Sequence, residues 1–495
     1  MKLFIVLLTG AFMLATGTSD VFAKKKEKVQ TEAKSDTVRT VSKKRNTQYP
    51  RLFKNKRVVT KKGLITIHKI NDKLYFEFPK SLLGRDFLMG SSVSATSNNT
   101  SGLVGQTMTT PLHIRFAIQE DQIYMQNVTP VSRMDVYSNQ SDISRAVAKS
   151  NIAPNMESFK IAAYNMDSTA VVFEVTKFFL ADNKRLPLFD QNSASLEDEK
   201  YGKLELKAIL KKNLSSIRNF YVFDDNLEIN LDMSFYQSLL ANKREVRGGN
   251  VRVKAVYSML LLPEEVMTWR LGDPRLGYTY TKKQKISTEK DGTAFSYLQH
   301  KWNLLPTDKE AYRRGDLVAP RKPVLFYIDS DFPEAWKKAI KEGVNWWNEA
   351  FKMAGFKDAV QTADFPANDT TFYAGNLKYS CIRYVPVNLS KTQSKVWVDP
   401  RSGEIINGTI IVGHDIAKTI ASQRFVQTAQ VDERMRGIQL SEEALLEGIR
   451  LYVAREVGHC LGLADNASAS AAFSVESLRS PEFTRQNGIA SSVMD

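Results

Sequence analysis

The sequence predicts an α+β fold in which antiparallel β domains precede a domain that mixes strands with long helices. From Tyr49 to His300, apolar and polar residues alternate in short runs separated by turn residues, which is the pattern of strands with one buried face. After His300, two long helical patterns appear among the strands. The chain has 495 residues, of which 43% are hydrophobic, so it is long enough for several domains with cores of their own.

Residues 1–23 have the pattern of a secretory signal peptide. Lys2 precedes an apolar run that ends at Leu14, and Val21-Phe22-Ala23 supplies the small residues of a cleavage site. This run is shorter than the ~20 residues that a membrane-spanning helix needs. We therefore expect an exported protein without a transmembrane anchor, located in the periplasm, on the outer membrane or outside the cell.

The formal net charge of +15 is concentrated near the N-terminus. Residues 24–62 hold fifteen Lys and Arg and three acidic residues, so they carry +12, and residues 63–495 carry only +3. Residues 24–48 lack apolar periodicity, which is typical of a basic disordered leader that acts as a spacer or adheres to an anionic surface. Because export argues against nucleic acid, the expected partner is a protein, a peptide or a cell-envelope component.

The β-rich half is predicted to contain a first domain at residues 49–130 and a second at residues 131–318. Hairpins are expected where LITIHKI and KLYFEF flank Asn71-Asp72, and where LHIRFAI precedes QIYMQNV. A third joins FKIAAYN to TAVVFEVTKFFL, and further strands follow at NFYVFDD, LEINLDMSF and VRVKAVYSMLLL. Short helical insertions are expected only around residues 196–214.

Residues 319–495 form the predicted α/β domain. A helix over residues 334–354 places an apolar stripe on one face and ends at Gly355. The stripe consists of Trp336, Ile340, Val344, Trp347 and Phe351. A second long helix covers residues 442–463, and the strands VLFYID, CIRYVPV and KVWVD and one through 405–412 complete the domain.

The chemistry-bearing residues lie at the end of the second helix, in the sequence REVGHCLGLAD from Arg455 to Asp465. In a helical HExxHxxGxxH motif, two His at i and i+4 face one way and bind zinc. The Glu activates a metal-bound water, and the Gly lets the chain turn to bring in the last ligand. Here Glu456, His459 and Gly462 keep that spacing, whereas Arg455 and Asp465 replace the outer two His. Met494 follows where such proteases have a Met-turn.

With these residues the chain resembles the large secreted bacterial metzincin-like zinc metalloproteases, whose N-terminal regions are domains of unknown function. The resemblance covers most of the mature chain, and in that family the motif is similar to HEVGHTLGLRHN. It includes GLITIHKINDKLYFEFPKSLLGRDFL, LLLPEEVMTWRLGDPRLGYTY, RRGDLVAPRKPVLFYID, WKKAIKEGVNWWNEAFKMAGFKDAV, IRYVPV, VDPRSGEIING, EVGHCLGLADN and SLRSPEFTRQNGIASSVMD.

The resemblance implies zinc as the cofactor and roles for six residues. Glu456 would be the general base, His459 and Asp465 metal ligands, Arg455 the occupant of the degenerate first-ligand position, and Gly462 and Met494 supporting residues. Relatives continue past the Met-turn, so the zincin domain is expected to be truncated at Asp495.

Arg455 opposes zinc binding, because its guanidinium stays protonated and offers no lone pair. We hypothesise that Arg455 and Asp465 form a salt bridge in place of the metal. The chain would then be a non-catalytic pseudoprotease with a binding or scaffolding role in the cell envelope. Two alternatives remain open: an active zinc-dependent endopeptidase that uses His459, Asp465 and Glu456, and a β module that binds an envelope polymer or a protein beside a vestigial zincin half.

Three further residues have two interpretations each. His414 is either a replacement metal ligand or a hydrogen-bonded histidine of a strand, and the second is favoured. Cys381 and Cys460 either form a disulfide or are buried free thiols, and their apolar surroundings favour free thiols.

Overall fold

The computed structural model describes residues 48–98, 104–105, 109–132, 134–136, 141–189, 196–198, 200, 202–286, 293–369, 372–386, 392–437 and 439–495. The chain divides into Met1–Lys43 and a compact unit, Lys44–Asp495, to which all that follows refers. The predicted signal peptide, and the predicted leader apart from Gln48, lie outside the described residues. Among the helices that are described, none combines the length and apolar character needed to cross a membrane.

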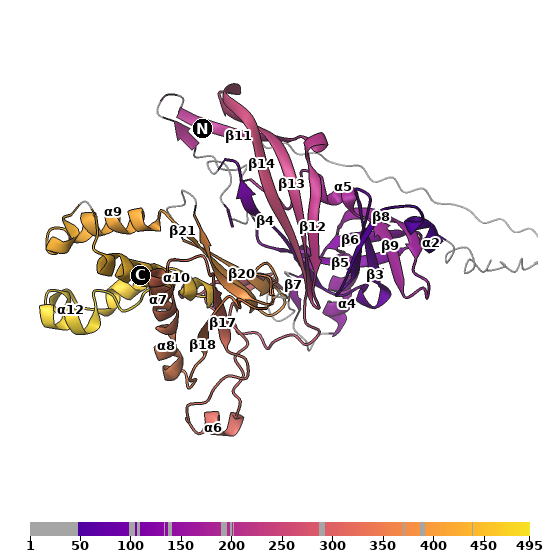
Figure 1. Ribbon diagram of the computed structural model, residues 1–495. Coiled ribbons are helices and arrows are strands. Elements are labelled where there is room, and N and C mark those ends of the chain that lie inside the picture. Colours follow the sequence, from indigo (N-terminus) through magenta and orange to yellow (C-terminus); the bar gives the residue numbers. More distant parts are fainter. Residues whose placement is uncertain are drawn as a thin grey trace, which may run out of the picture. The chain divides into compact units, whose positions relative to one another are not determined.

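A large antiparallel sheet forms most of the N-terminal half (Figure 1). Its described strands follow the order β1-β2-β3-β9-β8-β6-β5-β4-β14-β13-β11-β10, with β12 also paired to β13. They are β1 (Val58–Lys62), β2 (Thr66–Ile70), β3 (Lys73–Pro79), β4 (Phe87–Thr96), β5 (Leu112–Gln119), β6 (Gln122–Asn127), β8 (Asn155–Tyr164), β9 (Ala170–Glu174), β10 (Leu196–Asp198), β11 (Gly202–Leu210), β12 (Ser216–Val222), β13 (Asn226–Ala241) and β14 (Arg244–Leu261).

Short helices lie between these strands. They are α2 (Gln48–Phe53), α3 (Thr129–Ser132), α4 (Ser141–Ser150) and α5 (Thr176–Phe179), with 3-10 turns η1 (Lys80–Leu82) and η2 (Lys212–Leu214). A separate three-stranded sheet joins β7 (Met134–Val136) to β15 (Tyr280–Ile286) and β16 (Ala294–Gln299).

The three predicted hairpins are confirmed as β2–β3, β5–β6 and β8–β9. Asn71 in the first turn and Ser168 in the third adopt positive φ values of 54° and 60°. The expectation of helical insertions around residues 196–214 is wrong. Apart from η2 this segment forms β10 and β11, because alternate residues of β11 are buried as it pairs with β13.

The sheet also runs across the boundary expected at residue 130. Strands β8 and β9 come from after this boundary and lie between β3 and β6, and β14, also from after it, pairs with β4. The core is shared in the same way, since Phe78 packs 4.8 Å from Phe116 and 6.3 Å from Phe173, measured between ring centroids. A single cluster of buried apolar side chains thus connects the two sides of residue 130.

A five-stranded mixed sheet begins after the short helix α6 (Lys309–Arg313) and has the order β18-β17-β19-β21-β20. Its strands are β17 (Val324–Ile328), β18 (Val360–Asp364), β19 (Ser380–Val385), β20 (Gln393–Asp399) and β21 (Glu404–Gly413). All neighbours are parallel except β20, which pairs antiparallel with β21 and forms one edge.

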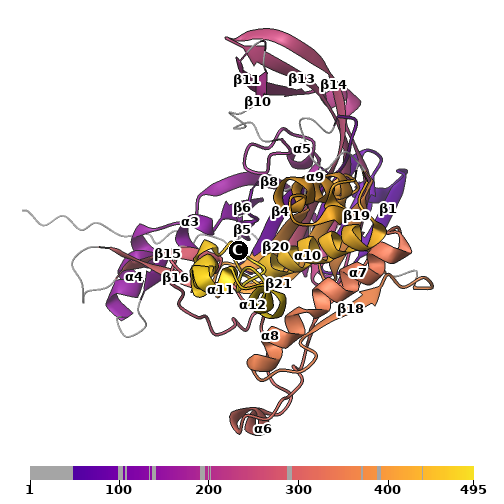
Figure 2. The same cartoon turned by 90° about the vertical axis from the view of Figure 1, so that its left-hand side faces the viewer.

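Helices α7 (Glu334–Asn345) and α10 (Glu442–Cys460) pack against this sheet and lie side by side (Figure 2). The other helices of this region are α8 (Trp347–Met353), α9 (Ile416–Thr428), α11 (Val475–Leu478) and α12 (Pro481–Asn487), with 3-10 turns η3 (Glu433–Met435) and η4 (Ala467–Ala472). The structure therefore confirms a β-rich chain of antiparallel strands with a helical C-terminal region.

The predicted helix over residues 334–354 is divided into α7 and α8. Trp346 separates the two helices. Its N–H donates to the Glu342 oxygen, four residues earlier, at 3.1 Å, as in an α-helix. The Glu349 N–H donates to the Trp346 oxygen, only three residues earlier. Gly355 ends α8 with a φ of 86°, as the sequence predicted.

A buried ionic network joins the β-rich half to the C-terminal sheet. The Arg401 side chain donates to Asp399 at 2.7 Å, to Asp86 at 3.3 Å and to the Pro263 carbonyl at 2.7 Å. The Asp399 side chain has no solvent exposure. Asp86 also accepts hydrogen bonds from His113 at 2.8 Å and from Arg115 at 2.5 Å. Burial alone would raise the pKa of the Asp86 carboxyl, but these two donors hold it well below its usual range.

Candidate functional site

Helix α10 carries the motif residues, and its first turn is stabilised locally. The Ser441 hydroxyl caps the helix by accepting from the Ala444 N–H at 3.3 Å. Glu442 and Glu443 place negative charge at the positive end of the helix dipole. The helix then continues to Cys460, so Arg455 and His459 lie one turn apart on the same face.

Close packing fixes the last turns of α10. A Cβ atom at Gly458 would lie 2.3 Å from Met494 Sδ and 2.7 Å from Trp347 Cζ2. The Trp347 indole N–H donates to the Ala454 carbonyl at 2.9 Å. Met494 is only 2% exposed. The Met residue therefore lies buried against the helix, where the resemblance placed it.

The turn after α10 needs a glycine for two reasons. Gly462 has a φ of 96°, and a Cβ atom there would lie 2.4 Å from the carbonyl oxygen of His300. The segment leading into β15 holds this turn, because the Thr279 N–H donates to the Gly462 oxygen at 2.8 Å and the Ala464 N–H donates to the Gly277 oxygen at 3.0 Å. These bonds direct the following Asp465 back toward the helix.

Arg455 and Asp465 form the salt bridge that the sequence predicted. Arg455 Nη2 lies 2.6 Å from Asp465 Oδ1. His459 Nδ1 lies 3.0 Å from the Leu463 carbonyl, so this nitrogen carries the proton. His459 Nε2 then faces Asp465 Oδ1 at 3.5 Å. The structure thus brings together three of the predicted site residues, with Arg455 and His459 both facing the Asp465 carboxylate.

Glu456, the predicted general base, is 7% exposed and accepts a hydrogen bond from the Thr392 hydroxyl at 3.0 Å. Thr392 comes directly before β20, the edge strand that packs against α10. Thr392 was not predicted from the sequence, because nothing in its local pattern distinguishes it from an ordinary strand residue. Trp347 was predicted only as part of the apolar stripe, and its indole hydrogen bond to α10 was not expected.

The residues present do not fit a zinc ion. His459 and Asp465 supply two donors, but the third position holds a guanidinium whose nitrogen contacts the same carboxylate. Across the described ranges, no group of three or more His, Cys, Asp and Glu side chains could hold a metal. His414 does not complete the set. It hydrogen-bonds the Tyr384 hydroxyl at 2.5 Å and stacks on Trp336, 6.0 Å away.

Both cysteines are buried free thiols, as predicted. Burial raises the pKa of the Cys381 thiol to about 12 and raises that of Cys460 as well. Cys460 lies next to His459, but a thiol with a raised pKa is a poor nucleophile near neutral pH. Neither residue contributes an activated thiolate to the site.

A helix that carries this motif spacing, a glycine turn and a methionine packed beneath it defines a metzincin-like C-terminal region. Residues 437–495 match a family model described as Met-zincin. Residues 47–96 and 105–307 match two models described as domains of unknown function, DUF5118 and DUF5117. No curated protein and no solved structure matches the chain. These matches support a metzincin-like family, whose related members bind zinc.

Proposed function

We propose that this protein is an exported, non-catalytic relative of the zinc metallopeptidases, with a binding or scaffolding role in the cell envelope. The contact of 2.6 Å between Arg455 and Asp465 carries this proposal. The signal-peptide pattern of residues 1–23 and the Met-zincin match over residues 437–495 support it.

The ion pair performs the cross-linking task that a metal has in a zincin. It ties helix α10 to the segment that follows the Gly462 turn. A fixed cation at Arg455 also repels a divalent cation, since two like charges a few ångströms apart interact unfavourably. The Asp465 side chain is 68% exposed, so we expect the pair to stabilise the fold by no more than about 1 kcal/mol. Glu456, held by Thr392, then serves packing and hydrogen bonding rather than catalysis.

Elemental analysis of the purified mature chain tests this proposal. We expect far less than one zinc per chain in the wild type. The double variant Arg455→His/Asp465→His restores three imidazoles at the motif spacing, so we expect about one zinc per chain. Arg479→His is the matched control, because Arg479 is exposed on the surface after α11. This control should bind no more zinc than the wild type.

A peptidase assay with and without a chelator completes the test. We expect no chelator-sensitive cleavage by the wild type. Near-stoichiometric zinc together with chelator-sensitive cleavage would overturn the proposal in favour of an active zinc endopeptidase that uses His459, Asp465 and Glu456.

A further inference from the structure

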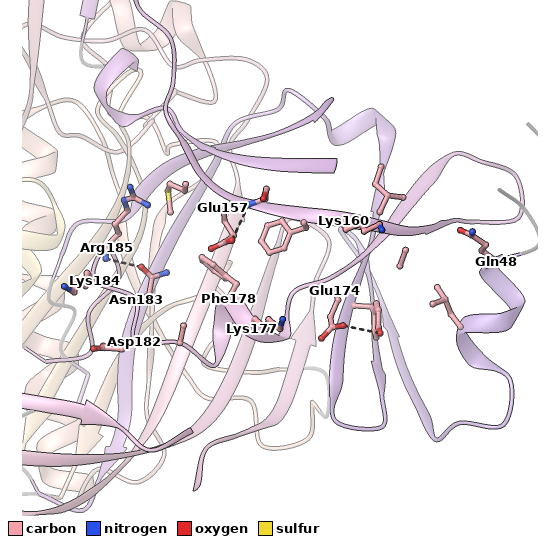
Figure 3. Close-up of a pocket in the computed structure, with 18 of the residues that line it drawn as sticks. Gln48, Glu157, Lys160, Glu174, Lys177, Phe178, Asp182, Asn183, Lys184 and Arg185 are labelled. Carbon is pink, nitrogen blue, oxygen red and sulfur yellow. Dashed lines mark hydrogen bonds between the residues drawn. The ribbon is translucent and has the colours of Figure 1, made fainter. Parts of the chain in front are cut away.

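A cavity of about 1070 Å³ lies in the β-rich half and is lined by none of the α10 residues. Helix α2, strand β8, helix α5 and the segment 181–185 surround it (Figure 3). All seven consecutive residues from Met156 to Ala162 line it. Side chains of successive strand residues point to opposite faces, so the cavity follows the edge of β8 rather than one face.

This edge of β8 has no strand partner within the described residues between Asn155 and Lys160. On one side, β8 pairs with β6 over this range. On the other side, β9 pairs with β8 only from Ile161 onward. The chain leaves β9 after Glu174 and enters α5, which removes the strand that would have continued the pairing.

Ser158 presents its backbone to the open edge. The Ile161 N–H donates to the Asp121 oxygen at 3.0 Å, on the β6 side. In an antiparallel ladder the hydrogen-bonded and non-hydrogen-bonded pairs alternate, so the N–H and C=O of Ser158, opposite Tyr124, point away from β6. Among the residues that the structure describes, the Ser158 N–H contacts only Glu157 Oε1, on the preceding residue, at 3.4 Å.

The floor of the cavity is apolar. Phe159 and Phe178 lie edge to face with their ring centroids 6.2 Å apart, and both are more than nine-tenths buried. Leu52 of α2 and Met156 of β8 add partly exposed apolar surface. A bound chain would therefore find apolar contacts on one side of its backbone.

The rim of the cavity is positively charged. Five exposed cations line it, namely Arg51, Lys160, Lys177, Lys184 and Arg185. In the part of the chain that the structure describes, none of them forms a salt bridge. Three acidic residues also line the cavity. Glu174 already pairs with Lys73 at 2.9 Å, so only Glu157 and Asp182 offset the charge of the five cations. Figure 3 shows the labelled cations on both sides of Phe178.

We propose that this cavity binds an extended acidic peptide segment of a partner protein, which adds to β8 as a strand at Ser158. Main-chain hydrogen bonds to an open strand edge give affinity, and the surrounding side chains select the sequence. The rim selects acidic side chains by charge complementarity. The chain's own leader does not fit, because residues 24–47 hold nine Lys and Arg against three acidic residues. The binding does not depend on whether the α10 site holds a metal.

Fluorescence anisotropy with the full mature chain tests the ligand class. The probe is a labelled, acetylated hexapeptide of alternating Glu and Val. Two comparison peptides are the same sequence with Lys in place of Glu, and the acidic sequence N-methylated at every residue, which keeps its charges but removes its amide donors. We expect the acidic peptide to bind, and both comparison peptides to bind at least about tenfold more weakly. Equal binding of the N-methylated peptide would overturn strand addition.

Variants of the protein test the location. Ser158→Pro removes one N–H at the open edge, where proline is tolerated because the ladder to β6 is untouched, and should weaken binding about fivefold. Lys160→Glu/Lys177→Glu should abolish binding at low salt. Lys207→Glu, at an exposed position on β11, is the matched control and should leave binding unchanged.

Hydrogen exchange gives a readout that does not require a variant. The acidic peptide should slow amide exchange in residues 155–161 of the wild type, so the proposal stays testable if Ser158→Pro fails to fold. Binding without protection there would contradict the proposal. The proposal would also be contradicted if the protein formed a concentration-dependent dimer that the peptide dissociates, because the strand bound to β8 would then come from a second copy of this chain.

Discussion

Single residues determine how the end of helix α10 meets its surroundings. Gly458 lets Met494 and Trp347 approach the helix, and Gly462 lets the chain turn beneath the His300 carbonyl. Arg455 and Asp465 then close the turn through one ion pair. The spacing of these residues can be read from the sequence. The sequence does not show which atoms lie so close to Gly458 and Gly462 that a larger side chain would collide with them.

Gly462→Ala should destabilise the protein more than Gly315→Ala. Both glycines have left-handed φ values, 96° and 92°, which cost a residue with a Cβ about 1–2 kcal/mol. A Cβ at Gly315 meets nothing within 4 Å, whereas one at Gly462 lies 2.4 Å from the backbone oxygen of His300. Denaturant unfolding of the two variants measures the difference. Equal losses would show that the turn relaxes away from His300 at no cost.

At the scale of elements, strands β15 and β16 support the site from outside the C-terminal sheet. His300 follows β16, and its ring nitrogens hydrogen-bond Thr281 at 2.9 Å and Thr279 at 3.0 Å. Burial lowers the pKa of His300 to about 4. The same Thr279 donates its N–H to Gly462, so the hairpin couples a half-buried histidine, which is neutral near pH 7, to the turn after α10.

We expect the protein to lose stability between pH 6.5 and about 4 through His300. In this window the unfolded chain binds a proton at His300 and the folded chain does not, so the free energy of unfolding falls as the pH falls. The loss is up to about 3 kcal/mol. His300→Gln should flatten the decline of the unfolding temperature between pH 7 and pH 4.5. His414→Gln changes an exposed position, so its unfolding temperature should decline over this pH range as that of the wild type does. An unchanged slope in His300→Gln would contradict this assignment.

At the scale of the whole molecule, the tripeptide Asp-Pro-Arg occurs twice, once where the two sheets meet and once at the surface. Asp399-Pro400-Arg401 lies in the ionic network with Asp86, which joins the C-terminal sheet to the large sheet. Asp273-Pro274-Arg275 forms a similar local ion pair, with Arg275 Nη2 2.6 Å from Asp273 Oδ2, but the Arg275 side chain is 87% exposed. Local sequence sets the turn in both cases, and only the surroundings distinguish them.

Arg401→Ala should therefore destabilise the protein by about 3 kcal/mol, because it leaves the buried carboxylate of Asp399 without its charged partner. Arg275→Ala is the matched control and should have little effect, since its ion pair faces water. Chemical denaturation followed by tryptophan fluorescence measures both. We also expect the Arg401→Ala transition to broaden or split, because this network couples the two halves. A single unshifted transition would show that other contacts couple them.

Much of the local structure was predictable. The turn residues around Asn71 identified the β2–β3 hairpin, and the apolar stripe identified the helical segment that ends at Gly355. The spacing of Arg455, His459 and Asp465 predicted an ion pair. The strands β10 and β11 were not predicted, because their alternating pattern is too short to indicate a strand by itself, and the pairing of β11 with β13 is not visible in the local sequence. The hydrogen bond from Thr392 to Glu456 was missed for a similar reason, since 64 residues separate its partners.

By itself the sequence determined the hairpin turns, the long helices and the replacement of a metal ligand by arginine, since these depend on residues close together in the chain. Only the tertiary structure determined that one edge of β8 is unpaired at Ser158. It also determined that Arg401 contacts the distant Asp86, whereas the Arg275 side chain is exposed to solvent. The physical reason is that periodicity determines which face of a strand is buried, but not which distant strand pairs with it or which charges the pairing encloses.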